Sequence, residues 1–316
     1  MGIVQARIGI IIILHKFLRT IVLLGLLVGA CSTSPGTPSG HITIVATTSL
    51  VADLVKNVVG DRAEVELLMP LGADPHEFQL TAKQGAQVRE ADLVVAIGLG
   101  LEAAVSDSLA AAASDGVAVV ELGPLLNPRS YPDGQPDPHV WMDPLRMADA
   151  AILLADALAA QDGTVDWNAS AQSYADQLIE TDRTIALLLA GLPSDRRVMV
   201  TNHDAFGYFA DRYGLEIIGV VIPGGSTLAN PSSAEIADLV KLIDEVGVPA
   251  LFVETTESDK LAIAIASETT KPVTVVELLG ASLAPAGEPG DTLISLLLVD
   301  AERIVAGLDK GQEQAP

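Results

Sequence analysis

Two kinds of hydrophobic pattern alternate along the chain from His41 onward. Residues 42–46 carry apolar side chains at every second position, which predicts a strand. Residues 49–59 repeat apolar side chains at helical spacing, and Gly60 ends the predicted helix. The same alternation continues to the end of the chain, and it is typical of a parallel β-sheet covered by helices on both faces.

The other elements follow from the same patterns. Further strands are predicted at residues 63–69, 93–97, 117–122, 197–201, 216–221, 250–254 and 273–278. Further helices are predicted at residues 81–90, 101–113, 205–213, 233–245, 259–268 and 292–308.

One long helical segment separates the two series of strands. Residues 168–192 contain neither proline nor glycine before Gly191, and a helix of this length would span roughly 35 Å. We therefore expect two α/β lobes, residues 41–165 and 194–312, joined by one long rigid helix within residues 166–193. A ligand is expected in the cleft between the lobes.

The first 30 residues have the composition of an export signal. They contain no acidic side chain, and the apolar run IVLLGLLVGA at residues 21–30 follows a basic cluster. This order is typical of a secretory signal peptide. We expect residues 1–30 to be removed and the remaining chain to be extracytoplasmic.

The only cysteine follows this apolar run directly. Val28-Gly29-Ala30-Cys31 resembles a bacterial lipobox, which implies cleavage before Cys31 and attachment of lipid to it. An ordinary membrane anchor and a buried cysteine are the alternatives. Residues 31–40 are rich in Ser, Thr, Pro and Gly and predict a flexible tether, and a single cysteine excludes an internal disulfide.

The charge of the chain narrows the possible partners. With 41 acidic and 18 basic residues the formal charge is −23, which excludes a nucleic-acid binder because nothing here could neutralise phosphates. Five Phe, four Tyr and two Trp are few for a site that stacks sugars or bases, so these ligands are disfavoured as well.

Three histidines stand in distinctive surroundings. His76 and His139 each lie in an Asp-Pro-His sequence, and His203 follows a predicted strand. Imidazole is a common ligand of zinc and similar metals, although a single histidine is more often a capping or surface residue. Separations of 63 and 64 residues do not fit a zinc finger or a His-Glu-x-x-His site. They fit a metal site assembled from several loops.

The chain resembles the cluster A-I solute-binding lipoproteins, the zinc and manganese receptors of bacterial ABC importers. The matching stretches are IVATTSLVADLVKNVVGD at 44–61, LGADPHEFQL at 71–80, VVAIGLGLE at 94–102, DPHVWMDP at 137–144, TNHDAFGYFADRYGL at 201–215, ALFVETTES at 250–258 and GDTLISLL at 290–297. The resemblance implies an extracytoplasmic, lipid-anchored monomer that captures a divalent metal ion in the inter-lobe cleft. It also implies a membrane permease as the partner.

The resemblance places the metal ligands at four positions. Three carry over as His76, His139 and His203, whereas the family's Asp-Ser-Leu step reads Ala281-Ser282-Leu283 here, without the expected carboxylate. We expect Glu254 to be the fourth ligand, because it ends a strand directed at the cleft.

Two alternatives for the fourth ligand are Glu277 and a water molecule. Asp74, Asp143 and Asp204 either orient the histidine rings from behind or only cap helices and turns.

Three imidazoles and one oxygen form a set that suits Zn²⁺, while Mn²⁺, the alternative, prefers more oxygen. A metallohydrolase with Glu254 as general base is a competing hypothesis, and an adhesin with a structural metal is another. The extent of the family resemblance favours a receptor, and not an enzyme.

Overall fold

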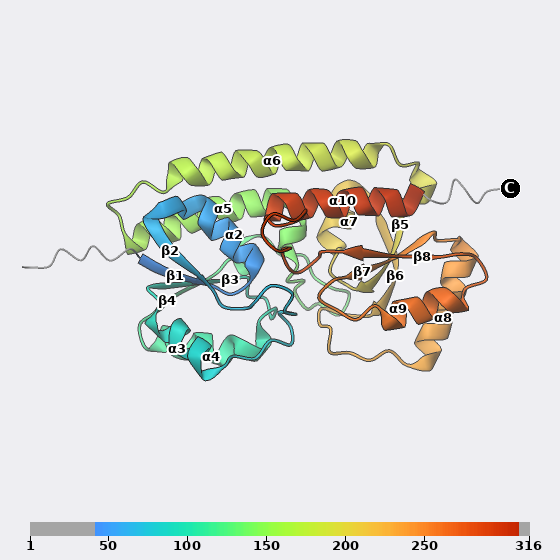
Figure 1. Ribbon diagram of the computed structural model, residues 1–316, viewed down its shortest axis with the longest axis horizontal. Coiled ribbons are helices and arrows are strands. Elements are labelled where there is room, and N and C mark those ends of the chain that lie inside the picture. Colours follow the sequence, from blue (N-terminus) through green and yellow to red (C-terminus); the bar gives the residue numbers. More distant parts are fainter. Residues whose placement is uncertain (1–41, 310–316) are drawn as a thin grey trace, which may run out of the picture. The chain divides into compact units, whose positions relative to one another are not determined.

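The strands form two parallel sheets of four strands each in the computed structural model, which describes residues 42–309 (Figure 1). The first sheet has the order β2-β1-β3-β4, with β1 at Ile42–Ala46, β2 at Ala63–Leu67, β3 at Leu93–Ala96 and β4 at Ala118–Glu121. The second has the order β6-β5-β7-β8, with β5 at Val198–His203, β6 at Glu216–Ile222, β7 at Ala250–Glu254 and β8 at Thr274–Leu278. The same strand order occurs in both lobes, which confirms the two-lobe α/β fold.

Helices cover both faces of each sheet (Figure 1). The helices are α2 at Ser49–Val59, α3 at Ala82–Glu90, α4 at Ser106–Ser114, α5 at Pro144–Gln161, α6 at Asn168–Ala190, α7 at Gly207–Tyr213, α8 at Ser233–Val246, α9 at Lys260–Glu268 and α10 at Leu293–Asp309. In the first lobe α2 and α5 lie on one face and α3 and α4 on the other. In the second, α7 and α10 lie opposite α8 and α9.

One hydrophobic core extends through both lobes. It lies under α5, α6 and α10 and joins Ile44 and Leu154 of the first lobe to Leu178 of α6 and to Phe252 and Leu296 of the second. Two smaller clusters, one in each lobe, fill the opposite faces of the sheets. Because α6 packs against α2, α5 and α10, it is part of this shared core and not an isolated connector.

A partly buried hydrogen-bond group also ties the lobes together. The Asp53 carboxylate on α2 accepts hydrogen bonds from the Tyr174 hydroxyl of α6, at 2.8 Å, and from the Leu293 backbone N–H of α10, at 3.1 Å. Three helices therefore meet at one side chain.

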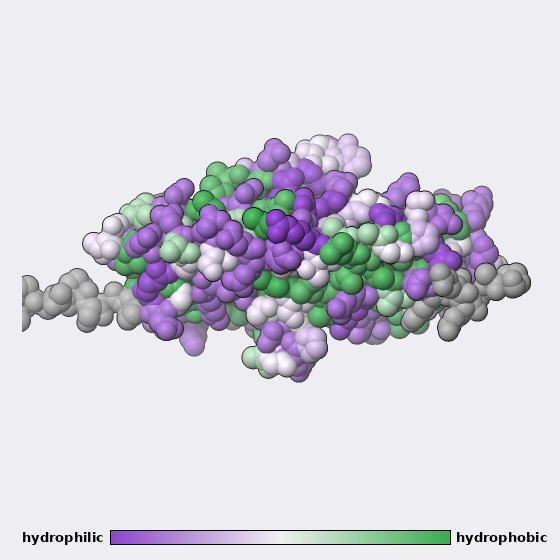
Figure 2. Space-filling model, turned by 90° about the horizontal axis from the view of Figure 1, so that it is seen from above, coloured by the Kyte–Doolittle hydropathy of each residue, from purple (hydrophilic) through white to green (hydrophobic). Residues whose placement is uncertain are grey.

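Hydrophilic residues cover much of the surface seen from above, with apolar patches between them (Figure 2). Among residues 42–309, no helix has the length and apolar character that crossing a membrane requires. The predicted signal peptide at 1–30, the tether at 31–40 and Cys31 lie outside the described residues.

Most predicted elements are present within one or two residues of their expected ends, and 49–59 and 250–254 match α2 and β7 throughout. The structure adds α5, which the sequence patterns did not predict, since its many alanines give little contrast between an apolar and a polar face. The division at 41–165, 166–193 and 194–312 stays an interpretation.

The helix predicted at 101–113 begins later than expected. A 3₁₀ turn occupies Ala103–Val105, and α4 starts at Ser106. The buried Glu102 carboxylate explains this, because it accepts hydrogen bonds from the backbone N–H groups of Ile97 and Gly98 and from the Thr47 hydroxyl. These bonds fix Glu102 in a loop geometry.

The loop after β8 is held by α10. The carboxylate of Asp300 is 1% exposed and accepts the backbone N–H groups of Leu279, at 2.8 Å, and Gly280, at 3.0 Å. The Gly280 carbonyl in turn accepts a hydrogen bond from the Trp141 indole, at 3.1 Å. Asp300 therefore positions a loop that touches the other lobe's side of the cleft.

Replacing Asp300 with alanine should destabilise the protein by about 2–4 kcal/mol, because two buried N–H groups lose their acceptor. Urea unfolding followed by circular dichroism measures this change. Glu302→Ala, on the exposed face of the same helix, should change the free energy of unfolding by less than about 0.5 kcal/mol. Equal effects of the two substitutions would contradict the assigned role of Asp300.

Candidate metal centre

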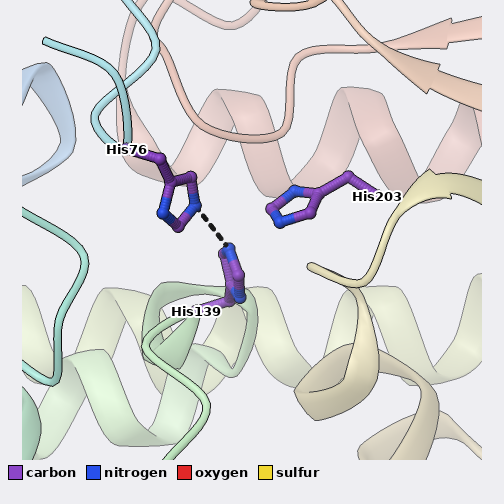
Figure 3. Close-up of side chains that lie close together, drawn as sticks. All are labelled: His76, His139 and His203. Carbon is purple, nitrogen blue, oxygen red and sulfur yellow. Dashed lines mark hydrogen bonds between the residues drawn. The ribbon is translucent and has the colours of Figure 1, made fainter. Parts of the chain in front are cut away.

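Three buried histidines from separate segments converge (Figure 3). His76 lies in the loop after β2, His139 directly precedes a 3₁₀ turn at Val140–Met142, and His203 is the last residue of β5. The ring centroids are 5.4 Å apart for His76 and His139, 5.1 Å for His76 and His203, and 4.8 Å for His139 and His203. One nitrogen from each ring lies within 4.8 Å of the other two, so a single ion could bind all three.

The loop that carries His76 is fixed by its own aspartate. Asp74 Oδ1 accepts the His76 backbone N–H at 2.8 Å, and Pro75 between them restricts the backbone. Asp74 Oδ2 accepts the hydroxyl of Thr227, at 2.5 Å, from the loop after β6. The same carboxylate therefore shapes the turn and links it to the second lobe.

The ring of His139 is oriented by Asp137. Asp137 Oδ1 lies 2.8 Å from His139 Nδ1 and also accepts the His139 backbone N–H at 3.0 Å. The Tyr131 hydroxyl donates to the same oxygen, at 3.0 Å, and Arg129 pairs with the other oxygen at 2.9 Å. Since a carboxylate only accepts, this network assigns the proton to Nδ1 of His139 and leaves Nε2 free as a ligand.

The pairing of β5 with β7 brings a carboxylate to His203. Thr201 is in register with Phe252, so His203 and Glu254, each two residues further along, end their parallel strands at the same level. Glu254 Oε1 lies 3.1 Å from His203 Nδ1. His203 Nε2 is buried and lacks a hydrogen-bond partner among the described residues, which indicates a position meant for a ligand.

The spacing of the first two histidines suits a metal ion. Nε2 of His76 and Nε2 of His139 are 3.3 Å apart, as the dashed line in Figure 3 shows. Two nitrogens bound to one tetrahedral zinc ion at about 2.0–2.1 Å would lie about 3.3 Å apart. Without an ion, His76 Nε2 can donate a hydrogen bond to the lone pair of His139 Nε2; with one, both nitrogens can point their lone pairs at it.

The electrostatic surroundings of the histidines differ. Burial, together with the neighbouring charges of His139 and His203, lowers the pKa of His76 to about 2, so this ring is neutral at physiological pH. Burial also opposes protonation of His203, but the hydrogen bond and charge of Glu254, with the charge of Glu257, raise its pKa above the ordinary value. Protons therefore compete with a metal ion more strongly at His203 than at His76.

None of the candidates for the fourth ligand lies within 4.8 Å of all three histidine nitrogens. Glu254 is buried and contacts Nδ1 of His203, the side of the ring opposite to Nε2. The side chain of Glu277 is exposed on β8. Ala281 is buried and offers no ligand atom.

The three aspartates named from the sequence do not contact the ring nitrogens. Asp74 accepts backbone and hydroxyl groups, Asp143 caps α5 by accepting the Leu145 N–H, and the Asp204 backbone carbonyl accepts the Tyr131 hydroxyl. The carboxylates that do contact the rings are Asp137 and Glu254. For Asp137 a signal was present in the sequence: it stands two residues before His139, as Asp74 stands before His76.

Comparison with known proteins supplies the family. Residues 44–307 match the model of the family "Zinc-uptake complex component A periplasmic". The manganese ABC transporter substrate-binding lipoprotein PsaA of Streptococcus pneumoniae is 27% identical, over 91% of this chain and 96% of that protein. The zinc-binding protein TroA of Treponema pallidum is 29% identical, over 93% of this chain and 98% of its own length.

Solved structures share the fold. The periplasmic zinc-binding protein TroA of Treponema pallidum superposes with a TM-score of 0.80 at 28% identity, covering 85% of this chain and 99% of that one. A manganese-bound periplasmic metal-binding protein of Candidatus Liberibacter asiaticus gives a TM-score of 0.73 at 21% identity, covering 84% of this chain and 99% of that one, and shows the same fold.

Replacing Asp137 with alanine should weaken zinc binding about 10- to 100-fold, since the His139 ring loses the acceptor that fixes its tautomer and orientation. Competition with a zinc-chelating dye measures the affinity. Asp149→Ala, an exposed aspartate on α5, is the matched control and should leave it unchanged. An Asp137→Ala variant with unaltered affinity would show that His139 needs no orienting carboxylate.

Proposed function

Because the chain belongs to the family of zinc-uptake complex component A proteins, we propose that it is an extracytoplasmic receptor that binds a divalent metal ion and delivers it to the permease of an ABC importer. The observation that carries the proposal is the convergence of His76, His139 and His203, three buried imidazoles from three segments of the chain. The relatives PsaA and TroA, named for manganese and zinc binding, support it.

We propose zinc as the ion, with manganese as the alternative. All three candidate ligands are imidazole nitrogens, which suit zinc better than manganese. The 3.3 Å separation of the two Nε2 atoms also fits a tetrahedral zinc ion. Manganese is the alternative because several relatives are named for manganese.

The fourth position is the least constrained part of the proposal. Glu254 was the expected ligand, but its contact with Nδ1 of His203 supports a role in orienting that ring. With Ala281 where the family resemblance implies a carboxylate, a water molecule is the best-supported fourth ligand. Three imidazoles and a water still complete a tetrahedral site.

We infer that the protein is not an enzyme. A metallohydrolase would need a general base beside the metal-bound water, and Glu254 was the candidate. Glu254 instead faces the opposite side of His203 and is only 2% exposed. This placement supports a site that holds an ion without acting on a substrate.

The anchoring and the partners extend the same proposal. Cleavage before Cys31 and lipid attachment to that residue would tether the receptor to the membrane, and the word lipoprotein in the name of PsaA supports this. We propose that it works as a monomer, without nucleic acid, and that its protein partner is the permease.

The first test is a metal competition. Purified protein is stripped of metal, exposed to equimolar Zn²⁺, Mn²⁺ and Fe²⁺, and analysed by mass spectrometry for metal content. We expect one zinc ion per chain, lost in His139→Ala and retained in His41→Ala, a histidine outside the three-histidine group. One manganese ion would keep the receptor and overturn the choice of zinc, whereas no metal would remove the proposal.

Zinc affinity should decrease as the pH falls. Metal binding needs neutral imidazoles, and the raised pKa of His203 makes this ring take up a proton more readily than His76. Below that pKa, the apparent dissociation constant should rise by about tenfold per pH unit, as measured by titration against a zinc buffer. An affinity that is constant from about pH 7 to about pH 5 would rule out a three-histidine site.

A further inference from the structure

A second cluster of ligand atoms lies on the outer side of His203. Nδ1 of His203 is 3.1 Å from Glu254 Oε1 and 3.6 Å from Glu257 Oε1. Ligand atoms at about 2.1 Å from one ion lie about 3.0–3.4 Å apart, so these separations are close to those of a coordination shell. All three residues belong to the second lobe: His203 ends β5, Glu254 ends β7, and Glu257 lies in the loop after β7.

Glu257 is held in this cluster with one oxygen unused. Its side chain is 9% exposed, and the Asn202 amide donates to Oε2 at 2.9 Å. Oε1 is buried and has no hydrogen-bond partner among the described residues. A buried carboxylate oxygen without a donor is costly, which points to a ligand that this oxygen receives.

The charges in the cluster favour a cation. One carboxylate oxygen of Glu254 and one of Glu257 lie within 4.8 Å of each other, close enough for two negative charges to repel. Within residues 42–309, neither carboxylate forms an ion pair with a lysine or an arginine. A divalent ion between the two carboxylates would relieve their repulsion and would give Glu257 Oε1 the partner that it lacks.

A cavity borders this cluster at Glu257. It has a volume of about 400 Å³, and its wall includes Glu257. Asp74 and Glu77 from the first lobe and Thr256, Ser258 and Lys260 from the second also line it, so with Glu257 the wall carries three carboxyl groups against one ammonium group. The cavity therefore connects solvent with Glu257.

We propose that Glu254, Glu257 and Nδ1 of His203 form an outer cation site that receives a divalent ion from this cavity before the three histidines bind it. The proposal rests on the receptor function proposed above. Two carboxylates and one imidazole form an oxygen-rich set, which suits Mn²⁺ as well as Zn²⁺ and binds more weakly than three imidazoles.

The two sites share one imidazole, and this makes them alternatives. A neutral histidine has one nitrogen lone pair and one N–H, so His203 offers Nδ1 to the outer ion or Nε2 to the inner ion. When the ion moves inward, Nε2 releases its proton to water and Nδ1 takes one up from water, so that Glu254 accepts a hydrogen bond from Nδ1. The ion thus passes across a single ring.

The equilibrium test removes the inner site and keeps the outer one. His76→Ala/His139→Ala protein is titrated with Mn²⁺, and free Mn²⁺ is followed by electron paramagnetic resonance. We expect one ion per chain with a dissociation constant on the order of 10⁻⁴ M, as in weak carboxylate sites. Adding Glu257→Gln should weaken binding at least about tenfold, whereas adding Glu302→Gln should not. No binding by the double variant, or equal binding with Glu257→Gln, would refute the outer site.

A kinetic test keeps all three histidines. Stopped-flow mixing of apo-protein with Zn²⁺ should show association slowed about tenfold by Glu257→Gln and no more than about twofold by Glu77→Gln, which removes the same charge from the same cavity. If both variants slowed zinc association equally, the effect would be a general electrostatic attraction of the ion to the cavity, and the proposal would be overturned. Wild-type protein that binds no zinc would refute the receptor function itself; normal zinc binding with failure of both tests would refute only the outer site.

Discussion

The arrangement of the metal centre depends on the hydrophobic layer that the two lobes share. His76 lies in the loop after β2 of the first sheet and His203 ends β5 of the second, so their rings meet only if the two sheets keep a fixed relation. Leu178 of α6 and Leu296 of α10 lie in one continuous core with Ile44 and Phe252 of the two sheets. Separating the lobes would expose this core to water at a cost of about 25 cal/mol per Å² of apolar surface. The shared layer therefore pre-organises the ligands, and binding need not supply the energy to assemble them.

Within that frame, carboxylates behind the rings decide what the histidines can do. Asp137 and Glu254 each accept from the Nδ1 side of a ring, which turns the Nε2 atoms of His139 and His203 toward one point. A hydrogen bond of this kind makes the ring a better ligand, but it also stabilises the protonated form. Metal affinity and proton competition are thus two results of the same contact, and Glu254 contributes to both.

The sequence predicted the parts of this site that depend on local pattern. Alternating strand and helix periods located β5 and β7, and the Asp-Pro-His sequences identified His76 and His139. The role of Glu257 depends on information that no local pattern contains, namely the parallel register that sets β7 beside β5 and the cavity above their ends. The sequence patterns missed α5 for a simpler reason. Alanine fits an apolar or a polar face equally well, so the contrast between the two faces of this helix is weak.

The replacement at position 281 changes where the negative charge of the site resides. An aspartate there would bind the ion directly, whereas Ala281 leaves three neutral imidazoles to face a doubly charged ion. Asp137 is already paired with Arg129, so the compensating charge must come mainly from Glu254, which reaches the ion only through the His203 ring. Such an arrangement keeps hard oxygen ligands away from the inner site and moves them to its outer side, at Glu254 and Glu257. Selectivity for a nitrogen-preferring ion and attraction of any divalent ion can in this way be separated in space, on the two sides of His203.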